Sequence, residues 1–166
     1  VNFIFIAIFL GYSIGSAPII SFHYGAKNDN ELKNLFKKSI SLIGSWGIML
    51  FVIAQLIAGP LAKLFVGYNA DLFLMTKHGF QIFCFAFLIN GFNIFGSSFF
   101  TALNNGLISA AISFLRTLVF QLSVVLILPM ILGINGIWIS VAIAELLTLC
   151  VTVTCLIRKR KVYHYI

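Results

Sequence analysis

Long apolar stretches separated by short polar breaks dominate the sequence. Between His78 and Ile157 the only charged residues are Arg116 and Glu145. With about 1.5 Å of helix per residue and roughly 30 Å of hydrocarbon to cross, this stretch holds three membrane-spanning helices with their turns. Two further charge-free stretches, residues 1–26 and 39–62, supply one helix each. The pattern therefore predicts an all-α fold, a polytopic membrane bundle of five transmembrane helices.

Turn signals place the ends of these helices. Polar, glycine or proline breaks occur at residues 25–30, 59–60, 104–106 and 133–136. We expect the spans at about residues 1–24, 39–60, 79–103, 107–132 and 136–157, followed by a basic tail at 158–166. Residues 31–38 are expected to form an amphipathic helix that leads into the second span. Residues 61–77 are expected to form a mixed connector at the membrane interface.

The composition excludes several other classes of protein. Hydrophobic residues make up 61% of the 166 residues and charged residues only 9%, whereas a soluble domain is about 25% charged. The mean hydropathy is +1.08. A water-soluble globular domain, a disordered chain and a disulfide-stapled chain are all incompatible with these values.

The basic residues are distributed unevenly between the two ends of the spans. Four lysines follow the first span and four basic residues follow the fifth, whereas two lysines follow the second span and none follows the fourth. By the positive-inside rule, the sequence predicts a multi-pass protein of the cell membrane with a cytoplasmic C-terminus. This topology accounts for the net charge of +7, so we expect a membrane anchor in the tail and no nucleic-acid partner.

The chain begins at Val1, directly within an apolar stretch and without an initiator methionine or a basic flank. A signal peptide needs a positively charged n-region, so that interpretation fails. We expect the chain to be the C-terminal part of a longer protein.

The third predicted span has polar side chains along one face. At about 100° per residue, that face comprises Asn90, Asn93, Ser97 and Thr101. The opposite face, which is expected to contact lipid, comprises Phe85, Leu88, Phe92, Phe95 and Phe99. The polar side chains either form hydrogen bonds with a neighbouring helix or line a water-accessible cavity.

Two charges lie inside the predicted spans. Ionisable residues in a membrane are costly, and they mark functional sites by default. Ideal helices place Arg116 and Glu145 about 10 Å apart along the membrane normal, and their side chains are expected to point in opposite directions. We therefore expect Arg116 to extend to the cytoplasmic interface rather than to pair with Glu145. Glu145 is either a proton carrier or a hydrogen-bonded structural group.

The first span contains residues that affect helix packing. Gly11 and Gly15 lie one turn apart and permit close contact with another helix, and Pro18 is expected to kink the span. Both features are common in transporters and in static bundles, so they do not decide the function.

The sequence gives little indication of a catalytic or metal-binding site. His23, His78 and His164 lie in separate segments, and the three cysteines are isolated in apolar helices. No phosphate-binding loop or nucleophile motif occurs. We expect no enzyme activity, no metal and no organic cofactor.

Two segments resemble the MATE family of multidrug and toxic compound extrusion transporters. The first, PIISFHYGAKN, contains Pro18, Gly25 and Ala26. The second, GINGIW, contains Gly133, Gly136 and Trp138. Arg116 precedes the second segment and an Ala-Glu pair ending at Glu145 follows it, in the order typical of the last two helices of the family.

The resemblance implies a two-lobed transporter of twelve helices, in which these five spans are helices 8–12. Such a protein would export small organic cations or drugs by alternating access, coupled to inward flow of protons or sodium ions. It also implies a missing N-terminal lobe, and it makes the polar face of the third span the candidate lining of the substrate cavity. His23 and Ala142 depart from the family pattern, and the third span lacks the aspartate that one branch of the family carries there.

Two other interpretations remain open. A flippase for lipid-linked polysaccharide precursors shares the overall architecture but is expected to have a large basic cavity. A non-transporting membrane subunit would use the polar faces only as helix interfaces.

Overall fold

The computed structural model describes residues 2–165 and confirms the all-α, five-span architecture. Within this range, five helices are long and apolar enough to cross a membrane. Val1 and Ile166, the outer limits of the predicted first span and tail, lie outside the described residues. The helices, in chain order, are α1 (Asn2–Gly25), α2 (Asp29–Val66), α3 and α4 (Ala70–Phe83 and Phe87–Ala102), α5 and α6 (Gly106–Phe114 and Leu122–Leu132) and α7 (Ile134–Tyr163).

Two of the five spans contain a local change of helix type. A 3₁₀ turn, η1 (Cys84–Ala86), joins α3 to α4, and a π-helical segment, η2 (Leu115–Gln121), joins α5 to α6. π-Helical segments inside α-helices are rare and occur frequently at functional sites. Arg116 lies in η2, so the second irregularity adjoins a charge within a span.

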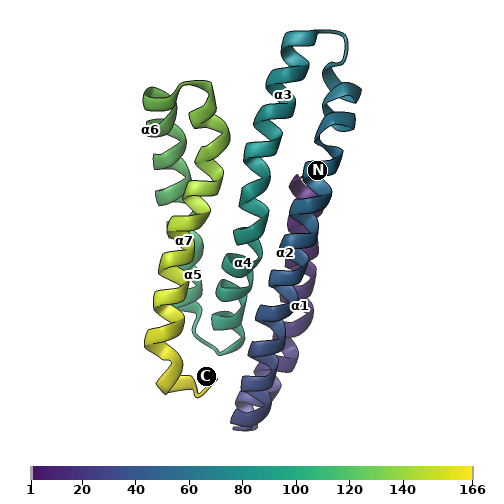
Figure 1. The fold of residues 1–166 in the computed structure, drawn as a ribbon. Helices are drawn as coiled ribbons and strands as arrows, with labels where there is room; N and C mark the ends of the chain where they lie inside the picture. The colour runs from purple at the N-terminus through teal and green to yellow at the C-terminus, as the bar shows by residue number, and fades with distance from the viewer. Residues whose placement is uncertain (1, 166) are drawn as a thin grey trace.

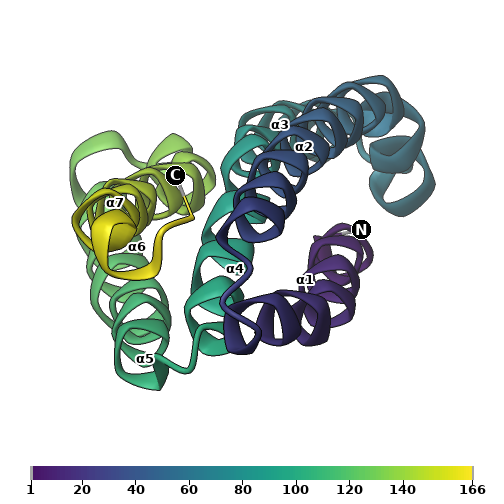
Figure 2. The same ribbon diagram turned by 90° about the horizontal axis from the view of Figure 1, so that it is seen from below.

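The span formed by α3 and α4 is the centre of the bundle. Successive spans run in opposite directions (Figure 1), and α1 and α2 lie on one side of α4 while α5, α6 and α7 lie on the other (Figure 2). Helix α4 packs against α1, α2, α5 and α7. In the most apolar 18-residue stretch of this span, 56% of the residues are buried. The corresponding value for the span that contains α5 and α6 is 6%.

The helices extend beyond the limits that the hydropathy pattern predicts. Helix α2 has 38 residues and continues through Pro60 to Val66, and α3 begins at Ala70. Residues 61–66 and 70–77 are therefore helical rather than a separate connector, and the turn is only 67–69. Asn69 makes this short turn possible, because its side chain accepts hydrogen bonds from the first backbone N–H groups of α3. Similarly, α7 continues through most of the predicted tail to Tyr163.

The aromatic core corrects the predicted lipid-facing side of the third span. Phe85 is 51% exposed, as expected, but Phe95 and Phe99 are 1% and 0% exposed. Both pack against Phe36, with ring centroids 6.3 Å and 5.0 Å from it. The prediction failed because an apolar side chain suits a lipid-facing surface and a protein core equally well. Phe36 belongs to the predicted amphipathic segment at 31–38, which is helical but packs inward.

The end of the bundle that carries the C-terminus is closed by tyrosines. Tyr165 is fully buried, its ring centroid lies 5.1 Å from that of Phe36, and its hydroxyl donates to the carbonyl of Leu156. This burial raises the pKa of the Tyr165 hydroxyl above its ordinary value. The Asn105 amide donates to the Tyr163 hydroxyl at 2.7 Å, which ties the α4–α5 turn to α7.

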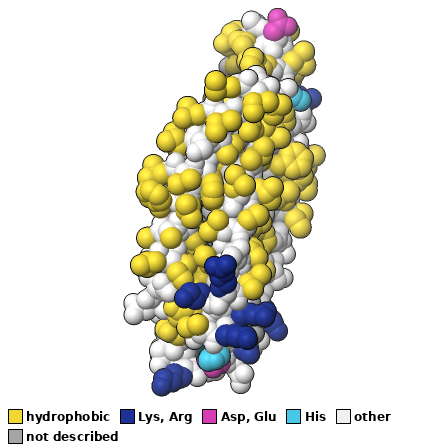
Figure 3. Space-filling view, turned by 90° about the vertical axis from the view of Figure 1, so that its left-hand side faces the viewer, with side chains coloured by type: hydrophobic (Ala, Val, Ile, Leu, Met, Phe, Trp, Pro, Cys, Tyr) yellow, Lys and Arg dark blue, Asp and Glu magenta, His cyan; other side chains and the backbone are white. Residues whose placement is uncertain are grey.

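The surface is organised as expected for a protein in a bilayer. Hydrophobic side chains cover the middle of the face shown in Figure 3, and lysines and arginines gather toward one end of it. That end holds the 25–29 turn, the 102–106 turn and the C-terminus (Figure 1).

Two glycines illustrate different packing requirements. A Cβ atom at Gly136 would meet the Leu128 carbonyl oxygen at 2.5 Å, so α6 and α7 approach closely only because this residue lacks a side chain. In contrast, a Cβ atom at Gly15 would meet nothing within 4 Å among the described residues. The predicted close helix contact at Gly11 and Gly15 is therefore absent from residues 2–165.

We predict that Gly136→Ala lowers the stability of the full-length protein by about 1–3 kcal/mol, the usual range for overpacking against atoms that cannot move aside. The measurement is thermal unfolding in detergent. Gly15→Ala is the matched control and is expected to unfold at the wild-type temperature. Equal unfolding temperatures for Gly136→Ala and the control would contradict the close approach of α6 and α7.

Candidate functional site

A connected set of polar side chains lies between α4, η2 and α7. We define the polar network as Asn90, Asn93, Arg116, Glu145 and Thr152. Arg116 Nε donates to Glu145 Oε1 at 2.8 Å, and Arg116 Nη2 lies 2.7 Å from the same oxygen. Arg116 Nη2 also donates to Asn90 Oδ1 at 2.9 Å. The ion pair thus joins η2 to α7, and the hydrogen bond from Arg116 to Asn90 joins η2 to α4.

Asn93 completes the polar network on its buried side. Its amide nitrogen donates to Glu145 Oε2 at 2.8 Å and to the Glu145 backbone oxygen at 2.9 Å. Its amide oxygen accepts a hydrogen bond from Thr152 Oγ1 at 3.1 Å. Asn90, Asn93 and Glu145 are at most 4% exposed. The carboxylate therefore has three donors around its two oxygens, which offsets the cost of its burial.

The ion pair corrects the prediction that Arg116 extends to the cytoplasmic interface. That prediction assumed α-helical geometry throughout the fourth span, but Arg116 lies in the π-helical segment η2. A π-helix has a wider turn than an α-helix, so the depth and direction expected for Arg116 from ideal α-helical geometry do not apply to it. Glu145 is hydrogen-bonded between helices, and these contacts leave both interpretations of its role open.

The four polar residues of the third span have two different environments. Asn90 and Asn93 are buried in the polar network and make interhelical hydrogen bonds. Ser97 and Thr101, which lie closer to the α4–α5 turn, line a cavity of about 280 Å³. We call it the hydroxyl cavity; its lining consists of Leu10, Ser13, Ile14, Ile94, Ser97, Ser98, Thr101, Ser113 and Arg116.

Hydroxyl groups connect α4 to α5 beside this cavity. Ser97 Oγ lies 2.9 Å from both Ser109 Oγ and Ser113 Oγ, and Thr101 Oγ1 donates to Ser109 Oγ at 2.7 Å. The sequence also places Ser109, Ser113, Arg116 and Ser123 on one face of the fourth span, and of these Ser123 is exposed rather than part of the hydroxyl contacts. Ser13 and Ser98 were missed, because neither belongs to a polar face that repeats along its helix.

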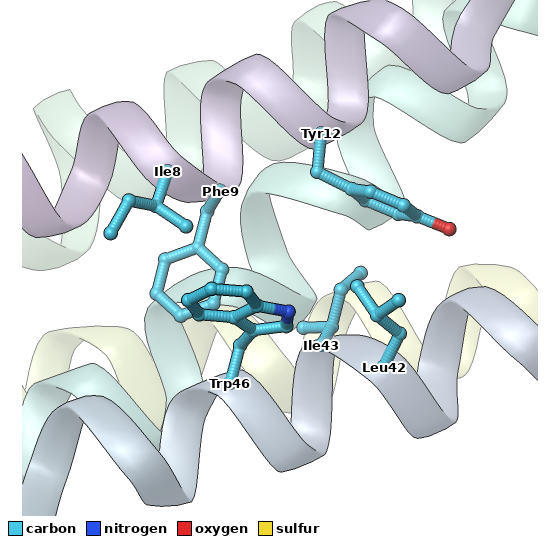
Figure 4. Close-up of a pocket in the computed structure, with 6 residues that line it drawn as sticks. All are labelled: Ile8, Phe9, Tyr12, Leu42, Ile43 and Trp46. Atoms are coloured by element: carbon cyan, nitrogen blue, oxygen red, sulfur yellow. The ribbon is translucent and has the colours of Figure 1, made fainter.

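The other cavities differ in chemistry. One lies between α1 and α2, where Phe9 and Trp46 face each other and Ile8, Leu42 and Ile43 fill the sides (Figure 4). Tyr12 lies at its end, and its hydroxyl is 2.8 Å from Ser39 Oγ. A second cavity, between η1, α4 and α7, is lined by apolar residues alone. These grooves suit lipid chains or apolar helices, whereas the hydroxyl cavity offers directional hydrogen bonds.

The residues that carry the sequence resemblance have mainly structural roles here. Gly133 adopts a φ of 59° in the tight turn between α6 and α7, and Trp138 packs so closely over Gly79 that a Cβ atom there would overlap its ring. Pro18 lies within α1, which continues through it to Gly25. Ala26 begins the turn into α2, and its backbone N–H donates to the Phe22 carbonyl.

The fold and site define a class: a polytopic helical membrane protein with an ion-paired polar network inside the bundle and a hydroxyl-lined cavity beside it. Comparison with known proteins then gives the family. The MatE family model matches residues 1–127, most of the chain. The chain belongs to the MATE family, whose members are transporters and not enzymes.

A solved structure shows the same fold. The chain is similar to the crystal structure of the Vibrio cholerae MATE transporter VcmN in the bent form, with a TM-score of 0.80 and 19% sequence identity. The match covers 95% of this chain and 37% of that transporter, so the chain spans little more than a third of the structure it resembles. Among curated protein sequences, none matches the chain significantly.

We predict that Arg116→Met destabilises the full-length protein by about 3 kcal/mol, because it leaves the buried Glu145 carboxylate without its counter-charge. This is the low end of the usual range for breaking a buried ion pair, since the Arg116 side chain is 21% exposed. Thermal unfolding in detergent is the measurement. Lys63→Met, which removes an exposed positive charge, is the control.

The double variant Arg116→Met and Glu145→Gln distinguishes loss of pairing from loss of packing. It removes both charges while keeping an oxygen that accepts from Asn93, so it is expected to be more stable than Arg116→Met alone. Wild-type stability of Arg116→Met would contradict the ion pair and support extension of Arg116 to the interface.

Proposed function

We propose that this chain forms most of the C-terminal lobe of an exporter of small organic cations and drugs. In this proposal the exporter works by alternating access and is driven by inward flow of protons or sodium ions. Membership of a transporter family supports a transport role. The observation that carries the finer proposal is the Arg116–Glu145 pair, which lies within two membrane-spanning helices beside a cavity lined with hydroxyl groups.

Glu145 is the proposed coupling carboxylate of this part of the chain. Carboxylates inside a membrane are characteristic of ion and proton pathways. A proton on Glu145 would remove its charge and leave Arg116 without a counter-ion. Proton binding and the state of the ion pair are therefore linked, and Arg116 also lines the hydroxyl cavity. This linkage is a physical route by which ion movement can alter the cavity.

The cavity favours an exporter over a flippase for lipid-linked polysaccharide precursors. Such a flippase is expected to need several basic groups to hold an anionic pyrophosphate. Of the residues in 2–165 that line the hydroxyl cavity, Arg116 is the one charged side chain, and it is paired with Glu145.

The proposed orientation places the tyrosine-closed end in the cytoplasm. That end carries Lys27, Lys33, Lys37 and Lys38 on one side and residues 158–161 on the other. Lys63, Asp71 and Lys77 lie toward the opposite end. The positive-inside rule favours the first group as cytoplasmic.

Efflux of ethidium from cells that express the full-length protein tests the function. The wild type is expected to export ethidium in an energy-dependent manner. Glu145→Gln keeps the hydrogen bond from Asn93 but cannot carry a proton or bind a cation as a carboxylate. We expect this variant to lose at least about tenfold in efflux rate, which corresponds to roughly 1.4 kcal/mol.

Membrane abundance of each variant is the control for folding. No efflux by an abundant wild-type protein would contradict the exporter, and efflux at the wild-type rate by Glu145→Gln would remove Glu145 from the coupling mechanism. Lys63→Met, at the opposite end of the bundle, is expected to export normally.

Labelling with a membrane-impermeant maleimide tests the orientation. In a full-length protein without its native cysteines, Lys159→Cys is expected to react in inside-out vesicles and to be protected in intact cells. Asp71→Cys is expected to show the opposite pattern. The reverse result for both positions would invert the proposed topology.

A further inference from the structure

A groove lies between α2 and α7, with α4 as its floor. We call it the α2–α7 groove; its volume is about 290 Å³, and its lining consists of Ile40, Phe92, Leu149, Thr152, Val153 and Leu156. Helix α4 packs against both α2 and α7, whereas these two helices make no extended contact with each other within residues 2–165 (Figure 2). Thr152 is the one polar residue of the lining, and its hydroxyl is used by Asn93. The groove therefore offers an occupant mainly apolar surface.

The groove adjoins the tyrosine-closed end of the bundle. Leu156 is the lining residue nearest to the C-terminus, and its carbonyl accepts the hydrogen bond from Tyr165. The apolar stretch of α7 ends at Ile157, before four basic residues. Leu149 lies about 12 Å of helix before that boundary, which is less than half of the roughly 30 Å hydrocarbon core. The groove thus lies within the leaflet that adjoins the tyrosine-closed end.

Basic side chains flank that end of the groove on both sides. On α2, Lys37 and Lys33 precede Ile40 by about one and two turns, so the three residues share a face. On α7, Arg160 follows Val153 by about two turns and shares its face. Lys37 and Arg160 are exposed, and none of the three basic side chains forms an ion pair within residues 2–165. Two helices thus place positive charge at one end of an apolar groove.

The acids at this end do not balance that charge. Asp29 Oδ2 lies 3.8 Å from His164 Nδ1. Glu31 lies nine residues before Ile40, which at about 100° per residue places it on the opposite side of α2. The groove therefore favours an occupant with a negative group at this end and an apolar part inside.

An anionic phospholipid has both features. Its acyl chain is as apolar as the lining, and lysine and arginine bind its phosphate through charge-assisted hydrogen bonds. Basic pockets between membrane helices are a recurrent form of lipid recognition. A soluble anion lacks the chain. A helix, about 10 Å in diameter, is too wide to enter a cavity of this volume.

We propose that the α2–α7 groove binds an anionic phospholipid, with one acyl chain between α2 and α7 and the phosphate between Lys37 and Arg160. The lipid borders the polar network, because Thr152 lines the groove and bonds to Asn93. The inference does not depend on the transported substrate or on the coupling ion.

Native mass spectrometry of the full-length protein tests the headgroup. The probes are palmitoyl-oleoyl phosphatidylglycerol and palmitoyl-oleoyl phosphatidylcholine, which have the same chains and differ in net charge. The wild type is expected to bind phosphatidylglycerol more tightly. The double variant Lys37→Gln and Arg160→Gln is expected to lose about 25-fold in affinity for phosphatidylglycerol, about fivefold for each charge. Its affinity for phosphatidylcholine is expected to remain.

The double variant Lys38→Gln and Arg158→Gln is the matched control. It removes the same charge from exposed positions at the same end of the same two helices. Each residue lies about 200° around its helix from a lining residue, Ile40 or Leu156, so the preference for phosphatidylglycerol is expected to persist. The proposal is overturned if the wild type binds both lipids equally. It is also overturned if both double variants lose phosphatidylglycerol equally, which would indicate general attraction to a basic surface.

Filling the groove tests the position of the acyl chain. Val153 is 42% exposed and lines the groove, and Val153→Trp is expected to weaken binding of both lipids. Val125→Trp is the control, because Val125 is 36% exposed on α6, outside the groove. It is expected to bind both lipids as the wild type does. Undiminished lipid binding by Val153→Trp overturns the proposal, whereas ethidium efflux tests the exporter separately.

Discussion

The need to satisfy buried charge inside a membrane is the constraint on which this structure depends. An unpaired Arg116 or Glu145 would be costly inside a membrane-spanning segment, and Glu145, which is 4% exposed, has little access to water that could replace its partner. The two residues come from different spans, so their pairing fixes how the span containing η2 packs against α7. Asn90 and Asn93 extend the constraint to α4, because each binds one member of the pair. Three of the five spans are thus held in one register by five side chains. The remaining contacts, mostly between phenylalanines and aliphatic residues, are less directional and can adapt to that register.

The π-helical segment follows from the same constraint. Ideal α-helices would leave the two charges at different depths, with their side chains directed apart. The chain adopts a less common backbone geometry over Leu115–Gln121 and places the guanidinium level with the carboxylate. The energetic cost of the irregular segment is small compared with that of an unpaired charge in the membrane.

The sequence predicted the number, type and order of the spans because hydropathy and turn residues report directly on what can cross a bilayer. It predicted their ends less well, since hydropathy detects hydrocarbon and not the helix itself; α2 continues well past its apolar part to Val66. It misplaced Phe95 and Phe99 because lipid and protein interior are equally apolar. It identified Arg116 and Glu145 as exceptional but not as partners, because the π-helical geometry that brings them together has no recognisable sequence signal. Ser13 was equally hidden, as a single serine in an apolar helix carries no periodicity.

The polar face of α4 illustrates how one sequence pattern can serve two purposes at different depths. Asn90 and Asn93 have side chains that both donate and accept, and they hold a buried charge pair. Ser97 and Thr101, further toward the α4–α5 turn, are smaller and leave space next to Arg116. Amides in those positions would fill the space, and hydroxyls at 90 and 93 would be too short to reach both partners that Asn93 contacts. The order of residue types along the face therefore separates the polar network from the adjacent hydroxyl cavity. Arg116 belongs to both. Arg116 therefore connects Glu145 to the cavity, because it pairs with the carboxylate and lines the cavity.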